Sequence, residues 1–276
     1  MTNLSQVINF EQYPIDSLDS PDGLEFLRQI KEELEKQGSC VLSRFVTDEA
    51  LETLAAEANQ VAHLGYQGPT MATPYFFNYN IGKGLDVDEN HPVNRQGKRN
   101  LRQVATDLIS PDHLLSKLYR SEMMIYFISK VLGQEAYCNK DRYQSLNISV
   151  MDEGGCQQWH FDSSPMVTTL LLQEPDTGGV FEYAPGIRSD EDENFDVVRD
   201  VLDGQRENVK QLSLKRGNLS LFRGHYSLHR VTEVAGPSQR LQAILGYATD
   251  PNYEGSADSS VLHYGPRIAT LESSML

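Results

Sequence analysis

The sequence predicts an α+β protein in which a helical N-terminal region precedes an antiparallel β-sandwich or barrel. Up to about residue 136, apolar residues recur at helical spacing between capping residues. Beyond residue 137 the chain breaks into short, β-rich stretches separated by Gly, Pro and Asp. Because no helices alternate with these stretches, we expect their strands to pair antiparallel. For 276 residues we expect one integrated domain, with residues 1–136 packing on a core of residues 137–276.

Three helices are expected in the first half, and each follows a Ser or Thr that can cap its N-terminus. The capping residues are Ser20, Thr47 and Ser110. The first and third helices also have a proline at their first position and a glycine just after their last. The third is expected to be continuous through "SPDHLLSKLYRSEMMIYFISKVLG". The apolar face expected for the first consists of Leu24, Leu27, Ile30 and Leu34.

Residues 65–100 lie between the second and third helices and are rich in Gly, Pro, Asn and Tyr. A passive connection of this length is uncommon in a compact domain. We therefore expect a functional loop or lid with short strands.

The strands of the second half are expected in six stretches: "YQSLNISVMD", "MVTTLLLQ", "GGVFEYAP", "QLSLKRGNLSLFRG", "HRVTEVAG" and "QRLQAILGYATD". Residues 188–210 interrupt them, first with an acidic run and then with a short helical pattern. This segment is expected to be a surface insertion between two strands.

Composition narrows the possible partners. The sequence has 39 acidic and 24 basic residues, a formal net charge of −15, so its surface should repel phosphate backbones and anionic lipids. We therefore expect a small-molecule substrate rather than nucleic acid or a membrane. No stretch resembles a secretory signal or a membrane span. Three cysteines without a CxxC pair indicate reduced thiols and a cytoplasmic protein.

The stretch "QQWHFDSSPMVTTLLLQ" places His160 and Asp162 two positions apart before an apolar run. In a strand both side chains would project from the same face, so the pair is either incidental or two metal ligands. His229 begins another expected strand far along the chain. Two histidines and one carboxylate form the facial triad that binds non-haem Fe(II) and leaves positions open. A 2-oxo acid and O₂ can then occupy the open positions.

Arg240 follows His229 by eleven residues, on the next expected strand. A dicarboxylate co-substrate such as 2-oxoglutarate has a second carboxylate, and a rigid guanidinium is suited to bind it in a bidentate manner. The alternative is that Arg240 is a surface arginine of an edge strand.

This pattern of H-x-D, a distal histidine opening an "HRV" strand and a following arginine resembles the Fe(II)/2-oxoglutarate-dependent oxygenase superfamily. The resemblance covers residues 137–250 and implies a double-stranded β-helix (jelly-roll, cupin-like) core. It also implies Fe(II), 2-oxoglutarate and O₂ as cofactor and co-substrates. With the N-terminal helices included, the chain is similar to the branch of free-amino-acid halogenases and their hydroxylating relatives.

Within that branch, halogenases have Gly or Ala in place of the carboxylate ligand, so that chloride can bind the iron. This chain has Asp162 there, and ligand counting therefore favours a hydroxylase. The substrate that the resemblance implies is a free amino acid or a similar small polar metabolite.

Other residues are candidates for the pocket. Thr169 and Gln242 are expected to contact 2-oxoglutarate from neighbouring strands. Candidate substrate contacts are Tyr143 and Asn147 on the strand before the triad, with Arg99 and Arg102 from the lid. His225 rivals His229 as the distal ligand, but His229 fits the "HRV" pattern better.

Three alternatives remain open at this stage. A cupin-like metal protein could use the same ligands without 2-oxoglutarate. An oxygenase could act on a protein side chain, and a purely structural jelly roll would leave the three residues apart. The sequence does not indicate the oligomeric state or the position of hydroxylation.

Overall fold

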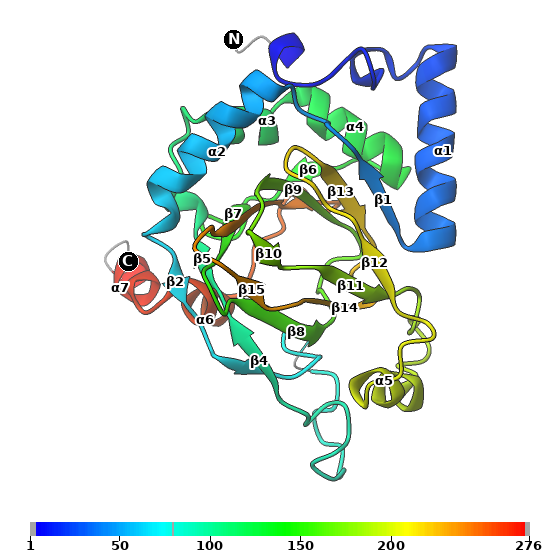
Figure 1. Ribbon diagram of the computed structural model, residues 1–276, viewed down its shortest axis with the longest axis vertical. Coiled ribbons are helices and arrows are strands. Elements are labelled where there is room, and N and C mark those ends of the chain that lie inside the picture. The colour runs from blue at the N-terminus through cyan, green and yellow to red at the C-terminus, as the bar shows by residue number, and fades with distance from the viewer. Residues whose placement is uncertain (1–3, 79, 274–276) are drawn as a thin grey trace.

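The computed structural model describes residues 4–78 and 80–273, and two antiparallel sheets face each other at its centre (Figure 1). The larger sheet has the order β1 (Ser39–Leu42), β13 (Leu219–Phe222), β9 (Val167–Gln173), β16 (Arg240–Leu245), β7 (Leu146–Met151), β5 (Arg102–Val104) and β2 (Tyr66–Gln67). The smaller sheet has the order β12 (Lys210–Leu212), β11 (Phe181–Ala184), β14 (Leu228–Val231), β8 (Cys156–His160), β4 (Gly97–Asn100) and β3 (Met71–Ala72). Two short pairs join β10 (Thr177–Gly178) to β15 (Val234–Ala235) and β17 (Tyr247–Ala248) to β6 (Tyr137–Cys138).

The connections between the sheets define the fold. The chain passes from β7 in the larger sheet to β8 in the smaller one and returns to β9 in the larger. It then crosses to β11 and β12 in the smaller sheet, to β13 in the larger, to β14 in the smaller and to β16 in the larger. The pairings between these strands are antiparallel. This is the double-stranded β-helix that the sequence predicted.

The described helices are α1 (Pro21–Gln37), α2 (Asp48–Ala62), α3 (Leu114–Tyr119), α4 (Glu122–Leu132), α5 (Phe195–Leu202), α6 (Ala257–Tyr264) and α7 (Arg267–Ser273). Short 3-10 turns occur at Leu4–Gln6, Ile15–Ser17 and Thr106–Leu108. In Figure 1, helices α2–α4 lie above the sheets, α1 stands to the right beside β1, and α5 lies at the lower end of the molecule. The acidic segment expected to form an insertion lies between β11 and β12, with α5 as its helix.

Strand alternation separates a helix-facing surface from an interior surface in the larger sheet. In β7, Leu146, Ile148 and Val150 belong to the main apolar core shared with the helices. In β16, Leu241, Ala243 and Leu245 do the same. The residues between them therefore point toward the smaller sheet. These interior positions are mostly polar, which is the arrangement expected of a barrel that holds a polar ligand.

The helix caps follow the sequence in α1 and α2. The Ser20 hydroxyl accepts a hydrogen bond from the Gly23 amide, and the Thr47 hydroxyl accepts one from Ala50. Gly38 ends α1 in the left-handed conformation at φ 73°. Within α1, Leu27, Ile30 and Leu34 are buried, but the prediction for Leu24 was wrong, because it is 55% exposed. Its place on the buried face is taken by Gly23, where a side chain would clash with the backbone at Leu18.

The third expected helix is two helices, α3 and α4, so the prediction of one continuous helix from Ser110 was wrong. The break falls at Ser121, whose hydroxyl accepts a hydrogen bond from the Met124 amide and so caps α4. An internal serine can start a new helix as readily as continue one, because its hydroxyl competes for backbone amides. Gly133 ends α4 as expected.

Residues 1–136 contribute strands as well as helices. Strands β1, β2 and β5 extend the larger sheet, and β3 and β4 extend the smaller one, so the segment at 65–100 contains the short strands expected of it. We propose that the two regions form one integrated domain, because the helices, β1 and β5 share an apolar core with β7, β9, β13 and β16.

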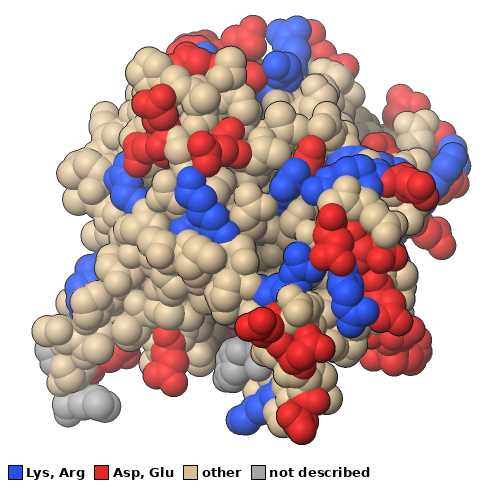
Figure 2. Space-filling view, turned by 60° about the horizontal axis from the view of Figure 1, so that its bottom comes forward, with Lys and Arg blue, Asp and Glu red and all other residues tan. Residues whose placement is uncertain are grey.

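Acidic and basic side chains lie interspersed on the face shown in Figure 2. Among the described residues, no helix combines the length and the apolar character needed to cross a membrane.

Candidate metal centre

His160, Asp162 and His229 converge inside the barrel, although His229 follows Asp162 by 67 positions in the chain. His160 ends β8 and pairs directly with His229 on β14, and their ring centroids are 4.0 Å apart. Asp162 follows β8, with Oδ1 3.9 Å from His160 Nε2 and Oδ2 3.4 Å from His229 Nε2. One ligand atom from each residue lies within 4.8 Å of the others, which is close enough to bind one metal ion.

Backbone carbonyls fix the orientation of both imidazoles. His160 Nδ1 lies 2.8 Å from the carbonyl oxygen of Gln158, and His229 Nδ1 lies 2.9 Å from that of Ser227. Each Nδ1 therefore carries the proton and donates it, which leaves the Nε2 lone pair available toward Asp162. The same tautomer is found in metal-ligating histidines whose other nitrogen is hydrogen-bonded to the backbone.

The charge states also suit a divalent cation. Burial, reinforced by the nearby His229, lowers the pKa of His160 to about 3, so this imidazole is neutral at pH 7. Burial by itself opposes ionisation of Asp162, but the neighbouring imidazoles, His229 first, hold the pKa of Asp162 below its ordinary value. Imidazole nitrogens and an ionised carboxylate oxygen form the donor set of non-haem Fe(II) sites.

A β-bulge in β8 places a second polar side chain beside the triad. His229 pairs with His160, but Val231 pairs with Gln157, so β8 has one residue more than β14 over this interval. As a result Gln157 also points inward, with Nε2 3.0 Å from Nε2 of His160. Trp159 packs on the outside against α5. Gln157 was missed because strict alternation from His160 places Gln158 inward instead.

Asp162 is held closely by the turn before β14. Its amide donates to the carbonyl of Gly224 at 3.1 Å, and its own carbonyl accepts from Asn78 Nδ2 at 3.0 Å. A Cβ atom at Gly224 would lie only 1.8 Å from Asp162 Oδ2. Glycine at 224 therefore makes room for the carboxylate in this position. His225, the rival candidate ligand, is not part of the triad, and its Nδ1 contacts Arg188 at 3.3 Å.

Arg240 lies at the start of β16 and is only 2% exposed, so it is not a surface arginine. Its Nη2 is buried without a hydrogen-bond partner, and no described carboxylate forms an ion pair with it. Burial lowers the pKa of Arg240 to about 10, which still leaves it protonated at pH 7. A buried, charged donor without a partner is costly unless a ligand pairs with it. Gln242, on the same face, donates to the hydroxyl of Thr169 at 2.6 Å.

Arg99 and Asn147 also point into the interior. Arg99 on β4 is 2% exposed and donates from Nη2 to Gln103 Oε1 at 2.8 Å, while its Nε has no partner. Asn147 on β7 is buried, with Oδ1 unpartnered. Burial lowers the pKa of Arg99 to about 10. A small pocket beside the triad is lined by His160, Gln157, Arg99, Phe76 and Phe77, among others.

The structure places Tyr143 and Arg102 away from this pocket. Tyr143 precedes β7, packs against α6 and α7, and donates from its hydroxyl to Glu272 at 2.6 Å. Arg102 lies on the helix-facing side of β5, where it donates to both carboxylate oxygens of Asp152 and to the Ala62 carbonyl. Both were expected to contact substrate, and neither is brought to the site.

His263 packs behind the pocket residues Phe76 and Phe77, and sequence reasoning missed it. It lies on α6, its ring centroid is 5.2 Å from those of Phe76 and Phe77, and its Nδ1 is buried without a partner. Burial, and then the charge of Arg99, lower the pKa of His263 to about 4, so it is neutral at pH 7. No local pattern marks it, because only the packing of α6 on β2 and β5 brings it here.

Comparisons with known proteins agree with this geometry. The family model described as Halogenase D matches residues 83–262. No curated protein sequence matches the chain. AviO1 from Streptomyces viridochromogenes is a similar solved structure, with 15% identity, a TM-score of 0.54, and coverage of 81% of this chain and 95% of that one.

Two further solved structures are similar. HygX from Streptomyces hygroscopicus, with nickel, 2-oxoglutarate and hygromycin B bound, has 13% identity and a TM-score of 0.54, over 80% of this chain and 86% of that one. A 2OG-Fe(II) oxygenase family oxidoreductase from Burkholderia pseudomallei has 14% identity and a TM-score of 0.50, over 81% and 91%. At these identities the likeness shows a shared fold.

Proposed function

The chain belongs to the Halogenase D family, within the Fe(II)/2-oxoglutarate-dependent oxygenase superfamily, and from this premise we propose that it hydroxylates an unactivated C–H bond of a small polar metabolite. The proposed substrate is a free amino acid or a derivative of one. The observation that carries the proposal is the position of Asp162, whose carboxylate completes the triad with His160 and His229.

The residues present fit the iron that the family uses. His160 and His229 would supply Nε2 and Asp162 a carboxylate oxygen, and the three would occupy one face of the metal. Bound Fe(II) and 2-oxoglutarate supply the oxidising power, by decarboxylation of the 2-oxo acid with O₂. The protein holds the ligands in place, orients the substrate and excludes water from the reacting atoms.

Arg240 is the residue that we assign to the far carboxylate of 2-oxoglutarate. Its buried, unpartnered Nη2 supports this assignment, because the charge has no described acidic neighbour to compensate it. Gln242 and Thr169, joined by their hydrogen bond on the adjoining strands, would contact the same ligand.

The substrate would lie on the side of the triad where Arg99 and Gln157 line the pocket with Phe76 and Phe77. Asn147, buried with its Oδ1 unpartnered, is proposed as a further contact. Arg99 is buried with no described carboxylate paired to it, and its guanidinium lies 5.5 Å from the centroid of the Phe76 ring. A carboxylate of the substrate would satisfy it. The phenyl rings would cover the substrate and keep water out.

The family description favours a second candidate function, halogenation. A halide needs a coordination position on the metal, and in this chain the Asp162 carboxylate, which lies against Gly224, would take that position. The contact with Gly224 indicates that the fold accommodates a carboxylate at this point. We therefore assign hydroxylation to this chain.

We also propose a cytoplasmic location. The three cysteines, Cys40, Cys138 and Cys156, are all unpaired thiols. Unpaired thiols are the usual state in a reducing compartment.

Replacing Arg99 with methionine is expected to raise the apparent KM for the substrate by about 30-fold or more, because a buried ion pair that loses one partner costs roughly 2–5 kcal/mol. The apparent affinity for 2-oxoglutarate should stay the same. The substrate is first identified by a screen of amino acids for oxygen insertion by mass spectrometry. Equal KM values for the wild type and Arg99→Met would show that another group binds the substrate carboxylate. Arg267→Met, which removes an arginine paired with Asp107 away from the site, is the matched control.

A further inference from the structure

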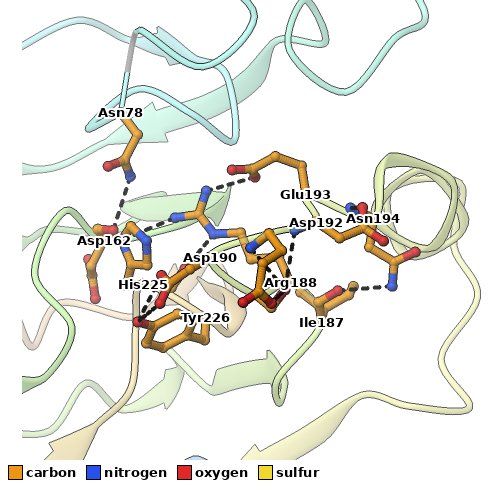
Figure 3. A network of polar contacts seen from close by, with 12 residues as sticks. Asn78, Asp162, Ile187, Arg188, Asp190, Asp192, Glu193, Asn194, His225 and Tyr226 are labelled. Atoms are coloured by element: carbon orange, nitrogen blue, oxygen red, sulfur yellow. Dashed lines mark hydrogen bonds and ion pairs between the residues drawn. The ribbon is translucent and has the colours of Figure 1, made fainter.

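Arg188 lies in the acidic segment after β11, and its side chain is completely excluded from solvent. Its guanidinium divides its donors between two neighbours (Figure 3). Nη1 donates to Glu193 Oε2 at 2.9 Å, and Nε donates to the backbone carbonyl of His225 at 2.5 Å. Nη2 lies 3.3 Å from Nδ1 of the same histidine. Arg188 therefore joins the acidic segment to the turn that precedes β14.

The same guanidinium stacks on the segment that bears the metal ligands. Its central carbon lies 4.0 Å from the centroid of the Phe161 ring, and Phe161 stands between His160 and Asp162 in the chain. Phe161 is fully buried and its amide donates to the carbonyl of Pro74. A desolvated cation over an aromatic face is attracted by the negative face of the ring. Arg188 thus restrains the residue just before Asp162.

The turn that Arg188 holds is also the turn on which Asp162 rests. The Asp162 amide donates to Gly224, next to His225, and the Asp162 carboxylate packs against the Gly224 Cα. A second link ties the turn to the acidic segment, since the Tyr226 hydroxyl donates to Asp190 at 3.1 Å. Displacement of this turn would therefore move the carboxylate relative to His229.

We propose that Arg188 is the positioning residue that fixes Asp162 in the orientation of the third metal ligand. It does so from both sides, through the Phe161 ring and through the turn at 224–226, without touching the metal or the substrate. This inference rests on the proposed function, because it requires a metal ion at the triad. It also gives the acidic segment a role, since Glu193 neutralises the buried guanidinium and Asp190 anchors the turn.

A purely structural role for Arg188 would depend on its ion pair with Glu193, whereas a positioning role depends on its contacts with His225 and Phe161. Two variants separate these roles. Arg188→Met removes all of these contacts, and Glu193→Gln removes only the ion pair. Gly224→Ala is a positive control, because its added Cβ would displace the Asp162 carboxylate directly. Arg267→Met is the control for a lost arginine ion pair elsewhere.

The experiment is an anaerobic titration of each apoprotein with Co(II), followed by the visible d–d absorption, which reports both affinity and coordination. Relative to the wild type, Arg188→Met and Gly224→Ala should bind Co(II) about 10-fold more weakly or worse and show an altered band, as expected when the support of a ligand is lost. Glu193→Gln and Arg267→Met should stay within about threefold of the wild type, because they leave that support in place.

Unchanged affinity and band shape in Arg188→Met would overturn the inference. So would an equal loss in Glu193→Gln, since it would mean that the ion pair alone matters. If the wild type itself bound no Co(II), the proposed function would fail first, which is a distinct result. Should Arg188→Met not fold, as judged by circular dichroism, Arg188→Lys takes its place. A lysine can pair with Glu193 but cannot span both neighbours, so it should also bind Co(II) more weakly.

Discussion

Replacing Asp162 with alanine is expected to abolish hydroxylation and to weaken metal binding. Loss of a residue that only supports a metal ligand already costs roughly 10- to 100-fold in metal affinity, and the loss of Asp162 itself should cost more. The reason is that Asp162 supplies the only carboxylate oxygen within the triad. Product formation by mass spectrometry and Fe(II) affinity by anaerobic titration are the measurements. Asp152→Ala removes a surface carboxylate that pairs with Arg102 and is the matched control.

The glycine variant at the same position adds a test of the reaction outcome. Asp162→Gly should leave a coordination position that chloride can occupy, so chlorinated product in the presence of chloride would support the assignment of this position. Hydroxylation at the wild-type rate in Asp162→Ala would contradict it and remove Asp162 from the ligand set.

Replacing Arg240 with alanine is expected to raise the apparent KM for 2-oxoglutarate by about 30-fold or more. The estimate follows from the roughly 2–5 kcal/mol lost when one partner of a buried charge pair is removed, at about 1.4 kcal/mol for each tenfold change. Succinate formation as a function of 2-oxoglutarate concentration measures it, with affinity for Fe(II) expected to stay the same. Arg240→Lys should be intermediate, since it keeps the charge but loses the planar fork.

Arg102→Ala is the control for Arg240, because Arg102 is paired with Asp152 on the helix-facing side of the larger sheet. An apparent KM that is unchanged in Arg240→Ala would show that another residue holds the far carboxylate. The remaining buried guanidinium of the interior, Arg99, would then be the first to examine.

Local signals in the sequence were sufficient for much of the fold. Ser20 and Thr47 cap their helices as predicted, because capping depends on a side chain and the amides a few residues away. The break at Ser121, where the hydroxyl caps α4, was not predicted, because the apolar helical pattern runs through it without interruption. The strands β2–β5 are short and mostly polar, and they form by adding to the edges of longer strands. β4 pairs with β8 and β5 with β7, and β3 and β2 then pair with β4 and β5.

The residues of the site also differ in whether local sequence signals could predict them. The convergence of His160, Asp162 and His229 was predictable from the ligand types and their spacing. Arg240 is buried as its predicted role requires, and that role stays a prediction. Gln157 was not predictable, because it points inward only through a bulge. Tyr143 was assigned to the pocket by extending the alternation of β7 backward, but the strand begins at Leu146. His263 and Arg188 come from a distant helix and an acidic loop, and only tertiary packing shows where they lie.

The measurement that tests the central claim most directly is the anaerobic addition of Fe(II) and then 2-oxoglutarate to the purified apoprotein, followed by visible absorption. We predict the metal-to-ligand charge-transfer band of a chelated 2-oxo acid, and its loss in His160→Ala. Binding of Fe(II) without this band would contradict the account, because the triad would then be a metal centre that does not use 2-oxoglutarate.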